Sequence, residues 1–342
     1  ACVQLRGPHD WADAVRAAGA EGTDLQMRRY GDFRALARLR ARLRAFAPDV
    51  IHAHLQPAEI HAALARSAAP AAAYVITRHN LDPFHRGPAP RLLEAWSTRR
   101  ADEVIGISEA VSRRVRAHAP GFPPERVTTI PYGVDLSPFG EAREAVGRQV
   151  RAELGLDDEA QVAGLVARLI PTKRADLLVE AMAELAPRWP RLVAVVAGDG
   201  AEMTALREQV QARGLGQRVR LLGERRDVPR LMQAFDVFAF PSVSEGFGLV
   251  LLEAMAARAP VIAADLPPMT DLVRHETTGL TCAPNDAKAL AAAIERLLSD
   301  GELARRLADA GRRQAEAHSI ARMTERTAEV YARALALRRS AG

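Results

Sequence analysis

Short apolar runs rich in β-branched residues alternate with Ala-, Leu- and Arg-rich helical stretches from one end of the chain to the other. Strands that are connected through helices pair in parallel, so this alternation predicts an α/β protein built from parallel sheets. In the first part of the chain we expect strands near residues 1–5, 22–27, 49–55, 72–79, 102–107 and 127–132. In the second part we expect them near residues 160–168, 191–197, 219–223, 236–240, 260–264 and 279–283.

The length of the chain, 342 residues, is more than one hydrophobic core usually organises. Pro138 and Gly140 interrupt the alternation, and a charged, weakly apolar stretch follows them. We therefore predict a Rossmann-like domain over residues 1–138, with six strands in one sheet, and a second one over residues 139–318. We expect residues 319–342 to form a C-terminal helix that packs back towards the first domain. Doubly wound domains bind ligands at the carboxyl ends of their strands, which predicts a site in a cleft between facing sheets.

Composition excludes several classes of protein. Apolar residues make up 48% and charged residues 26%, which is ordinary for a globular protein and excludes a disordered or collagen-like chain. The longest run without Asp, Glu, Lys or Arg is the eleven residues 67–77, whereas a membrane-spanning helix needs about twenty apolar residues. Cys2 and Cys282 lie in unrelated contexts, which excludes a disulfide framework and a cysteine metal site. No secretory signal is recognised, and we expect a cytoplasmic protein.

The net charge of +5 is unevenly distributed, because residues 28–46 contain seven Arg and a single acid. Within this segment apolar residues recur at helical spacing, at Phe33, Leu36, Leu39, Leu43 and Phe46. This pattern predicts an amphipathic basic helix over residues 33–46. The commoner interpretation is a solvated basic face, and the alternative is peripheral contact with an anionic membrane surface or an acidic acceptor. Nucleic acid is disfavoured as a partner, because no zinc finger or RNA-binding aromatic signature accompanies the charge.

The most informative segment, residues 240–256, reads as the end of a strand, a glycine-containing turn and a helix that begins near Gly248. The free backbone N–H groups and positive dipole end of a helix start favour a phosphate group, and Gly246 and Gly248 let an anion approach closely. Glu245 in the turn and Glu253 in the helix would repel a phosphate unless they face hydroxyl groups of a sugar or ribose. The segment therefore indicates a nucleotide sugar, although an ordinary capped turn with a solvated Glu253 is the alternative.

Cations follow another expected strand, where Arg168, Lys173 and Arg174 come after residues 162–167. Arg168 and Lys173 suit a diphosphate, and positioned cations stabilise the charge that a leaving nucleoside diphosphate gains. The alternative is a solvated run of charges in which Arg174 has no assigned task.

A glycine turn, Gly198-Asp199-Gly200, also follows a strand and superficially offers a dinucleotide fingerprint. The fingerprint fails at its third glycine, where Met203 stands, so a nicotinamide-dependent oxidoreductase is only a minor alternative. We interpret the turn as a tight loop that borders the nucleotide cleft. Asp residues never occur two apart in this chain, so the Asp-x-Asp pair that holds a metal on sugar diphosphates in another transferase fold is missing. We expect no cofactor and no metal, with the cations supplied by side chains.

Together these motifs resemble a known family. The matching segments are Arg168 with Lys173, Gly198-Asp199-Gly200, Leu222-Gly223-Glu224-Arg225, residues 241–248, Glu253-Ala-Met, Pro260-Val-Ile-Ala and Thr278-Gly-Leu. They are similar to the nucleotide-sugar domain of family 4 retaining glycosyltransferases, which have the two-domain GT-B fold. The resemblance covers nearly the whole chain, and the two Glu residues eight apart around Gly-Phe-Gly are its most specific element.

The resemblance implies a role for each matching residue. Arg168 and Lys173 would hold the diphosphate, Glu245 would bind hydroxyls of the transferred sugar, and Glu253 the hydroxyls of the ribose. The stretch around Arg225 would contact the base, and backbone N–H groups of residues 246–249 would meet phosphate and sugar. The donor-binding residues implied in this way are Gly198, Arg225, Gly246, Phe247, Gly248, Leu249 and Glu253.

In the first domain, Ile76-Thr-Arg-His79 ends a strand as the catalytic-cleft histidine of the family does, which adds His79 to Arg168, Lys173 and Glu245 as a catalytic candidate. His52, His54 and His61 are competitors for this role. The chain departs from the family in two ways. Arg174 stands where the family commonly has Gly, a change that we expect to be tolerated. The family's first strand, glycine-rich turn and helix have no counterpart before Ala1, so about one βα unit is expected to be missing.

The predicted function is transfer of a sugar from a nucleoside diphosphate sugar to an acceptor hydroxyl with retention of configuration. We favour a UDP-sugar over a GDP-sugar and expect a role in the synthesis of cell-envelope or polysaccharide glycans. The acceptor would be a glycan, a lipid-linked group or a small molecule, and the inner face of the membrane is a candidate location. The alternative from another class is a non-catalytic or inactive, truncated nucleotide-sugar-binding protein.

Overall fold

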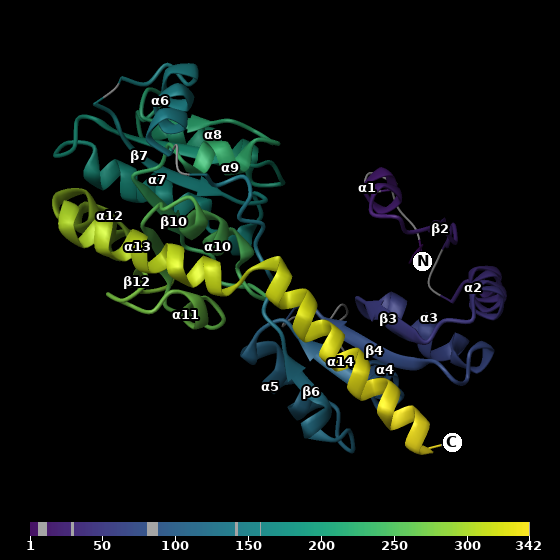
Figure 1. The fold of residues 1–342 in the computed structure, drawn as a ribbon. Coiled ribbons are helices and arrows are strands. Elements are labelled where there is room, and N and C mark those ends of the chain that lie inside the picture. Colours follow the sequence, from purple (N-terminus) through teal and green to yellow (C-terminus); the bar gives the residue numbers. More distant parts are fainter. Residues whose placement is uncertain (6–11, 29–30, 81–87, 141–142, 158, 342) are drawn as a thin grey trace. The chain divides into compact units, whose positions relative to one another are not determined.

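The computed structural model describes residues 1–5, 12–28, 31–80, 88–140, 143–157 and 159–341 (Figure 1). Two compact units divide the chain. Unit 1 comprises Ala1–Ile107, Val111–Ile130 and Arg326–Gly342, and unit 2 comprises Ser108–Ala110 and Pro131–Glu325. The main crossing from unit 1 to unit 2 thus falls between Ile130 and Pro131, earlier than the boundary that we predicted at residue 138.

Unit 2 is built on a six-stranded parallel sheet. Its strands are β7 (Gln161–Val166), β8 (Leu192–Ala197), β9 (Val219–Leu221), β10 (Val237–Phe240), β11 (Val261–Ala264) and β12 (Leu280–Cys282), in the order β12-β11-β10-β7-β8-β9. The chain runs outward from β7 to β9 and then returns to the other side of β7 at β10. The direction of winding therefore reverses between β7 and β10, which is the topological switch point where doubly wound sheets bind ligands.

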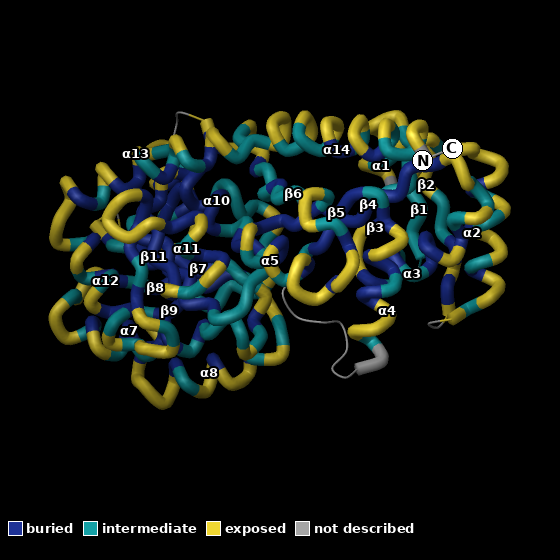
Figure 2. The backbone as a smooth tube through the Cα atoms, turned by 90° about the horizontal axis from the view of Figure 1, so that it is seen from below, coloured by how far each residue is buried: buried dark blue, intermediate teal, exposed yellow. Residues whose placement is uncertain are grey.

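Helices precede, connect and follow the strands of this sheet. They are α6 (Arg143–Glu153), α7 (Ala175–Leu185), α8 (Met203–Ala212), α9 (Val228–Met232), α10 (Leu249–Ala256), α11 (Met269–Leu272), α12 (Ala287–Ser299) and α13 (Gly301–Ala317). A 3₁₀ turn, η3 (Pro171–Lys173), precedes α7. The central strands are buried on both faces, which is why their sequences are nearly continuous apolar runs (Figure 2). Gly164 in β7 has a packing reason, since a Cβ there would lie 2.1 Å from the ring of Phe235.

Unit 1 contains a four-stranded parallel sheet in the order β3 (Val50–His54), β4 (Ala73–Arg78), β5 (Glu103–Gly106) and β6 (Val127–Thr129). A separate parallel pair is formed by β1 (Cys2–Gln4) and β2 (Gly22–Asp24). The prediction of one six-stranded sheet is therefore wrong, although each predicted strand exists. Within the described residues no ladder joins β1 to β3, and apolar packing of Val3 and Leu5 in one core with Ile51 links the two sheets instead. Alternation in a sequence identifies strands but does not say which strands share hydrogen bonds.

The helices of unit 1 are α1 (Ala12–Ala17), α2 (Phe33–Phe46), α3 (Gln56–Ala65), α4 (Pro88–Arg99) and most of α5 (Glu109–His118), with 3₁₀ turns η1 (Arg66–Ala68) and η2 (Pro124–Arg126). The last helix, α14 (Ile320–Ala341), begins in unit 2 and packs in unit 1 from Arg326 onward. There the Arg338 Nε donates to Asp102 at 3.0 Å, and Arg333 donates to the Thr128 hydroxyl at 2.8 Å. Just before its start, Val134 N donates to His318 O at 2.8 Å, so the junction between α13 and α14 is hydrogen-bonded to the segment that follows Ile130.

The basic helix α2 buries Ala35, Leu39 and Leu43 but not the two phenylalanines that we placed on its apolar face. Phe33 is 84% exposed and Phe46 is 48% exposed. At 3.6 residues per turn Phe33 lies roughly 100° around the helix from the leucine stripe, and Phe46 is the last helical residue, so helical spacing alone overestimated the buried face.

The arginines of α2 do more than face solvent. Arg38 donates to the Leu25 carbonyl and Arg40 to the Leu64 carbonyl, and Arg42 pairs with Glu21. These contacts attach α2 to its neighbours in unit 1. Across the described part of the chain, no helix has the length and apolarity to cross a membrane.

Candidate functional site

A cavity of about 660 Å³ opens in unit 2 at the carboxyl ends of β7, β8 and β10. Because it lies where the winding of the sheet reverses, we call it the switch-point cavity. The predicted site residues that line it are Arg168, Lys173, Gly198, Arg225, Glu245, Gly248 and Leu249. Gly246, Phe247 and Glu253 lie on the same loop and helix but do not line it, and His79 belongs to unit 1.

The glycine turn after β8 braces the loop that carries Arg168. A Cβ on Gly198 would lie 1.8 Å from Ala167 O, and one on Gly200 would lie 2.3 Å from Leu169 O. Both glycines have positive φ, +134° and +155°, and Leu169 N donates to Asp199 O at 2.8 Å. The turn therefore needs glycine for close backbone contact with the end of β7, which explains Gly-Asp-Gly without a dinucleotide.

Lys173 and Glu245 meet across the cavity wall and form an ion pair. Both side chains are mostly buried, with 17% and 12% of their surfaces exposed. Backbone contacts join the two loops, since Val243 N and the Ser242 hydroxyl both donate to Thr172 O, at 2.9 and 3.1 Å. The cation and the carboxylate are thus held on a common, hydrogen-bonded frame, whereas Arg168, which also lines the cavity, is exposed.

Arg174 forms structural contacts that the sequence did not predict. It adopts the left-handed conformation, with φ +52°, between η3 and α7. Its guanidinium pairs with Asp176, with an Nη2–Oδ2 distance of 2.8 Å, and donates to Asn285. Because the left-handed region favours glycine, the conformation accounts for a glycine in the family at this position. Arg174 is not among the residues that line the cavity.

The first turn of α10 closes one side of the cavity. Gly248 is its N-cap, with φ +92°, and no side chain caps the helix. Leu251 N donates to Gly248 O at 2.9 Å, so the first-turn N–H groups that can meet an acceptor are those of Leu249 and Val250. The ring of Phe247 is buried and packs edge-on against Tyr132, with ring centroids 5.5 Å apart. This side chain therefore holds the loop against the segment of unit 2 that follows Ile130.

Two further predicted residues have different surroundings. Arg225 lines the cavity and makes a forked interaction with Asp227, at 2.7 and 2.6 Å. Glu253 is half-buried on α10, and this burial raises the pKa of its carboxyl. It lies beyond the residues that line the cavity, and its contact with a ribose stays a prediction.

His79 follows β4 in unit 1 and belongs to a histidine cluster with His52 and His54. Its Nε2 lies 3.0 Å from His54 Nδ1. Burial, assisted by the neighbouring His54, lowers the pKa of His79 to about 4. The third competitor, His61, lies outside this cluster and is buried. Its Nδ1 lies 2.7 Å from Pro57 O within α3, an arrangement that is typical of a structural histidine.

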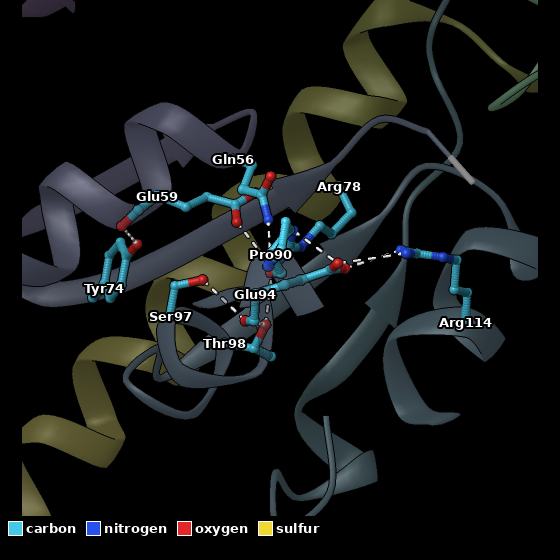
Figure 3. A network of polar contacts seen from close by, with 9 residues as sticks. All are labelled: Gln56, Glu59, Tyr74, Arg78, Pro90, Glu94, Ser97, Thr98 and Arg114. Atoms are coloured by element: carbon cyan, nitrogen blue, oxygen red, sulfur yellow. Dashed lines mark hydrogen bonds and ion pairs between the residues drawn. The ribbon is translucent and has the colours of Figure 1, made fainter. Parts of the chain in front are cut away.

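Sequence reasoning missed a buried charge network around Arg78, the residue that precedes His79 in the chain (Figure 3). Arg78 points to the opposite face of the sheet from His79 and pairs with Glu59 of α3 at 2.9 Å and with Glu94 of α4 at 3.5 Å. Arg114 of α5 pairs with Glu94 at 2.9 Å. Burial of Glu59 raises the pKa of its carboxyl to about 7, and Arg78 opposes this only in part. The sequence signal for this network was a single arginine at the end of the otherwise uncharged strand β4. The network holds this end of the strand in place, and His79 follows directly after it.

Among the described residues, no group of three or more His, Cys, Asp or Glu side chains is arranged to hold a metal ion.

Comparison with known proteins agrees with this arrangement. Residues 147–314 match the family "Glycosyl transferases group 1", and residues 3–138 match "Glycosyltransferase Family 4". The chain is 31% identical over 262 residues to alpha-D-kanosaminyltransferase of Streptomyces kanamyceticus, a match that covers 75% of this chain and 67% of that enzyme. It is 30% identical over 279 residues to alpha-maltose-1-phosphate synthase of Mycolicibacterium smegmatis, covering 75% and 72%.

The fold is similar to a solved structure, Anabaena Alr3699/HepE in complex with UDP-glucose. The TM-score is 0.83 at 25% identity, and the match covers 94% of this chain and 88% of that one. The two family matches fall on the two parts of the chain that the sequence motifs separated, and the relatives extend across both. The chain therefore belongs to the family 4 glycosyltransferases, enzymes of the GT-B fold.

Proposed function

We propose that this glycosyltransferase moves a sugar from a nucleoside diphosphate sugar to an acceptor hydroxyl, with retention of configuration and without a required metal ion. The observation that carries the proposal is the convergence of Arg168, Lys173, Glu245 and the uncapped first turn of α10 on one cavity at the switch point. Cations, helix N–H groups and a carboxylate at this place match the charges and hydroxyls of such a donor.

The chemistry that these groups support is electrostatic. As the bond between the sugar C1 and the diphosphate oxygen breaks, negative charge grows on the diphosphate, and Arg168 and Lys173 stabilise it. The acceptor oxygen attacks C1 from the same face, and its proton passes to a phosphate oxygen of the leaving group. The leaving group thus serves as the base, and the protein supplies no covalent nucleophile in this proposal.

The Lys173–Glu245 pair fits a site that exchanges partners when the donor binds. An ammonium group has three N–H donors, so Lys173 can keep one bond to Glu245 while it donates to a phosphate oxygen. The remaining acceptor positions of Glu245 can then accept from sugar hydroxyls. The pair keeps the carboxylate neutralised inside a mostly buried wall, where an unpaired charge would be destabilising.

The donor that we propose is a UDP-sugar, with the stretch around Arg225 beside the base. The similar Anabaena protein, which was solved with UDP-glucose, supports this choice. For the acceptor we propose a cell-envelope glycan, lipid-linked group or other hydroxyl compound. The exposed rings of Phe33 and Phe46, together with Arg34 and Arg44 on the exposed side of α2, support peripheral contact with an anionic membrane.

A ligand panel followed by product analysis tests this proposal. Thermal shifts measured with UDP, GDP, their glucose and mannose conjugates, and reduced nicotinamide dinucleotide should show the largest rise with a uridine ligand. Incubation of the preferred donor with acceptor candidates should give a product whose anomeric proton coupling matches that of the donor. Inversion of the coupling would refute retention. Donor binding without transfer to any acceptor would identify a binding protein instead.

A further inference from the structure

Three histidines gather at the carboxyl ends of β3 and β4 in unit 1. His52 and His54 are two residues apart on β3, so their side chains lie on one face of the sheet. His79 follows β4, whose Thr77 is paired in register with His54. The ring centroids of His52 and His54 are 4.2 Å apart, and those of His54 and His79 are 5.2 Å apart. The cluster is therefore a continuous row of rings that ends at His79.

Hydrogen bonds fix each ring in this row. His52 Nδ1 lies 2.7 Å from the Tyr331 hydroxyl of α14, and its Nε2 lies 2.7 Å from the Thr77 hydroxyl. His54 Nδ1 lies 3.0 Å from His79 Nε2. Partial desolvation by the surrounding protein lowers the pKa of all three rings, so they are neutral near pH 7. A bond between two neutral imidazoles needs an N–H on one ring and a bare nitrogen on the other, so it couples the tautomer of His79 to that of His54.

The backbone beside His54 is strained. Leu55 has φ +70° and ψ 147°, a conformation that glycine adopts far more readily than leucine. The Leu55 side chain is 43% exposed, so burial of this residue does not account for the conformation. Strained residues concentrate where a side chain must be held in one place for function, and here the neighbour that is held is His54.

We propose that His54 is a positioning residue for His79. Its bond to His79 Nε2 holds the orientation of the His79 ring and couples the tautomer of that ring to its own, and His52 packs against His54 and is itself held by bonds to Tyr331 and Thr77. The inference rests on the proposed function and on the catalytic role that the family resemblance implies for His79, which we place at the transferred sugar or the acceptor. In that function a ring that rotates freely, or that presents the wrong nitrogen, would meet the substrate in productive geometry less often.

The experiment uses the full chain with the donor and acceptor that the panel identifies. His54→Ala should lower kcat roughly 10–100-fold and leave the donor KM near its original value, because it disturbs geometry and not donor binding. His54→Asn should recover most of the loss, because its amide can occupy the place of Nδ1, whereas His54→Gln should not. In the His79→Ala background, His54→Ala should cause no further loss of kcat.

Controls separate this role from a structural one. His118→Ala removes an exposed histidine of α5 in unit 1 and should leave kcat unchanged. Melting temperatures of the His54 variants should stay close to that of the parent chain. In addition, ¹⁵N shifts of the His79 ring report its tautomer directly, and they should change in His54→Ala and revert in His54→Asn.

Two outcomes would overturn the inference. One is an unchanged kcat in His54→Ala, and the other is a loss that adds fully to that of His79→Ala. The proposed function fails separately, if Lys173→Ala keeps full activity. If Lys173→Ala is inactive while His79→Ala is fully active, the donor chemistry stands and the roles of His79 and His54 are refuted.

Discussion

The switch-point cavity of unit 2 and the histidine cluster of unit 1 both lie at the carboxyl ends of parallel strands, but they are assembled differently. Short contiguous loops form the cavity, and backbone contacts such as those of Gly198 and Thr172 brace them. The cluster consists of single side chains from β3, β4 and α14 that meet only through strand register and helix packing. A site built from contiguous backbone loops is visible in a sequence as a motif. A site built from side chains that are far apart in the sequence appears there only as isolated residues.

The largest effect is expected from the cations of the cavity. Lys173→Ala removes a positive charge from the place where the leaving diphosphate gains negative charge, and it leaves Glu245 without its ion-pair partner. We expect kcat/KM to fall by about 10²–10³-fold, with a smaller fall for the more exposed Arg168→Ala. Steady-state kinetics with the preferred donor measures both.

The adjacent cation provides the matched control for this prediction. Arg174→Gln removes a positive charge one residue away that pairs with Asp176 outside the cavity lining, so kcat/KM should remain within about twofold. Equal losses in Lys173→Ala and Arg174→Gln would mean that general charge, and not a positioned cation, determines activity.

A glycine substitution tests whether backbone contact builds the cavity. Gly198→Ala places a Cβ 1.8 Å from Ala167 O at a positive φ, and we expect the free energy of unfolding of unit 2 to fall by roughly 2–5 kcal/mol. Denaturant unfolding measures it. Gly216→Ala is the control, because its Cβ meets nothing within 4 Å, and it should be nearly neutral. Equal stability of the two variants would contradict the bracing role.

The buried network of unit 1 should make stability depend on pH. Burial holds the pKa of Glu59 at about 7 against an ordinary value of 4.5. Between pH 4.5 and 7 the folded chain therefore keeps a proton that the unfolded chain has released. The stabilising contribution is full below pH 4.5 and is lost as the pH rises to 7, a change on the order of 3 kcal/mol.

The substitution Glu59→Gln isolates this contribution, because a neutral amide of similar shape cannot titrate. Unfolding curves collected from pH 4.5 to 7.5 should show a shallower slope for the variant than for the parent chain. Identical slopes would assign the pH dependence to other groups.

The smallest effect is expected at Arg174. Arg174→Gly relieves the left-handed conformation, a gain of about 1–2 kcal/mol, and removes the ion pair with Asp176, a loss of about 1 kcal/mol or less. The melting temperature should therefore change by only a few degrees. A large loss of stability would show that the contacts to Asp176 and Asn285 outweigh the backbone strain.

Much of the fold and of the cavity could be predicted because the relevant signals are local. The twelve strands were found from apolar runs, and the family from motifs that each lie within a few residues of one another. The arrangement of strands was harder, since β1 and β2 form a separate pair and not part of one sheet. The sequence also did not show that the rings of Phe33 and Phe46 are exposed, because spacing along a helix does not specify how much of its face a neighbour covers.

The sequence by itself determined the α/β class, the family and part of the lining of the switch-point cavity, because backbone turns and helix starts depend on neighbouring residues. Only the tertiary structure decided that Lys173 pairs with Glu245, that Arg78 is held by two buried carboxylates, and that His54 bonds to His79. The physical reason is distance along the chain. These partners are 16 to 72 residues apart, and they meet only when sheet register and helix packing bring them within hydrogen-bonding range. A single sequence does not encode that geometry in any local pattern.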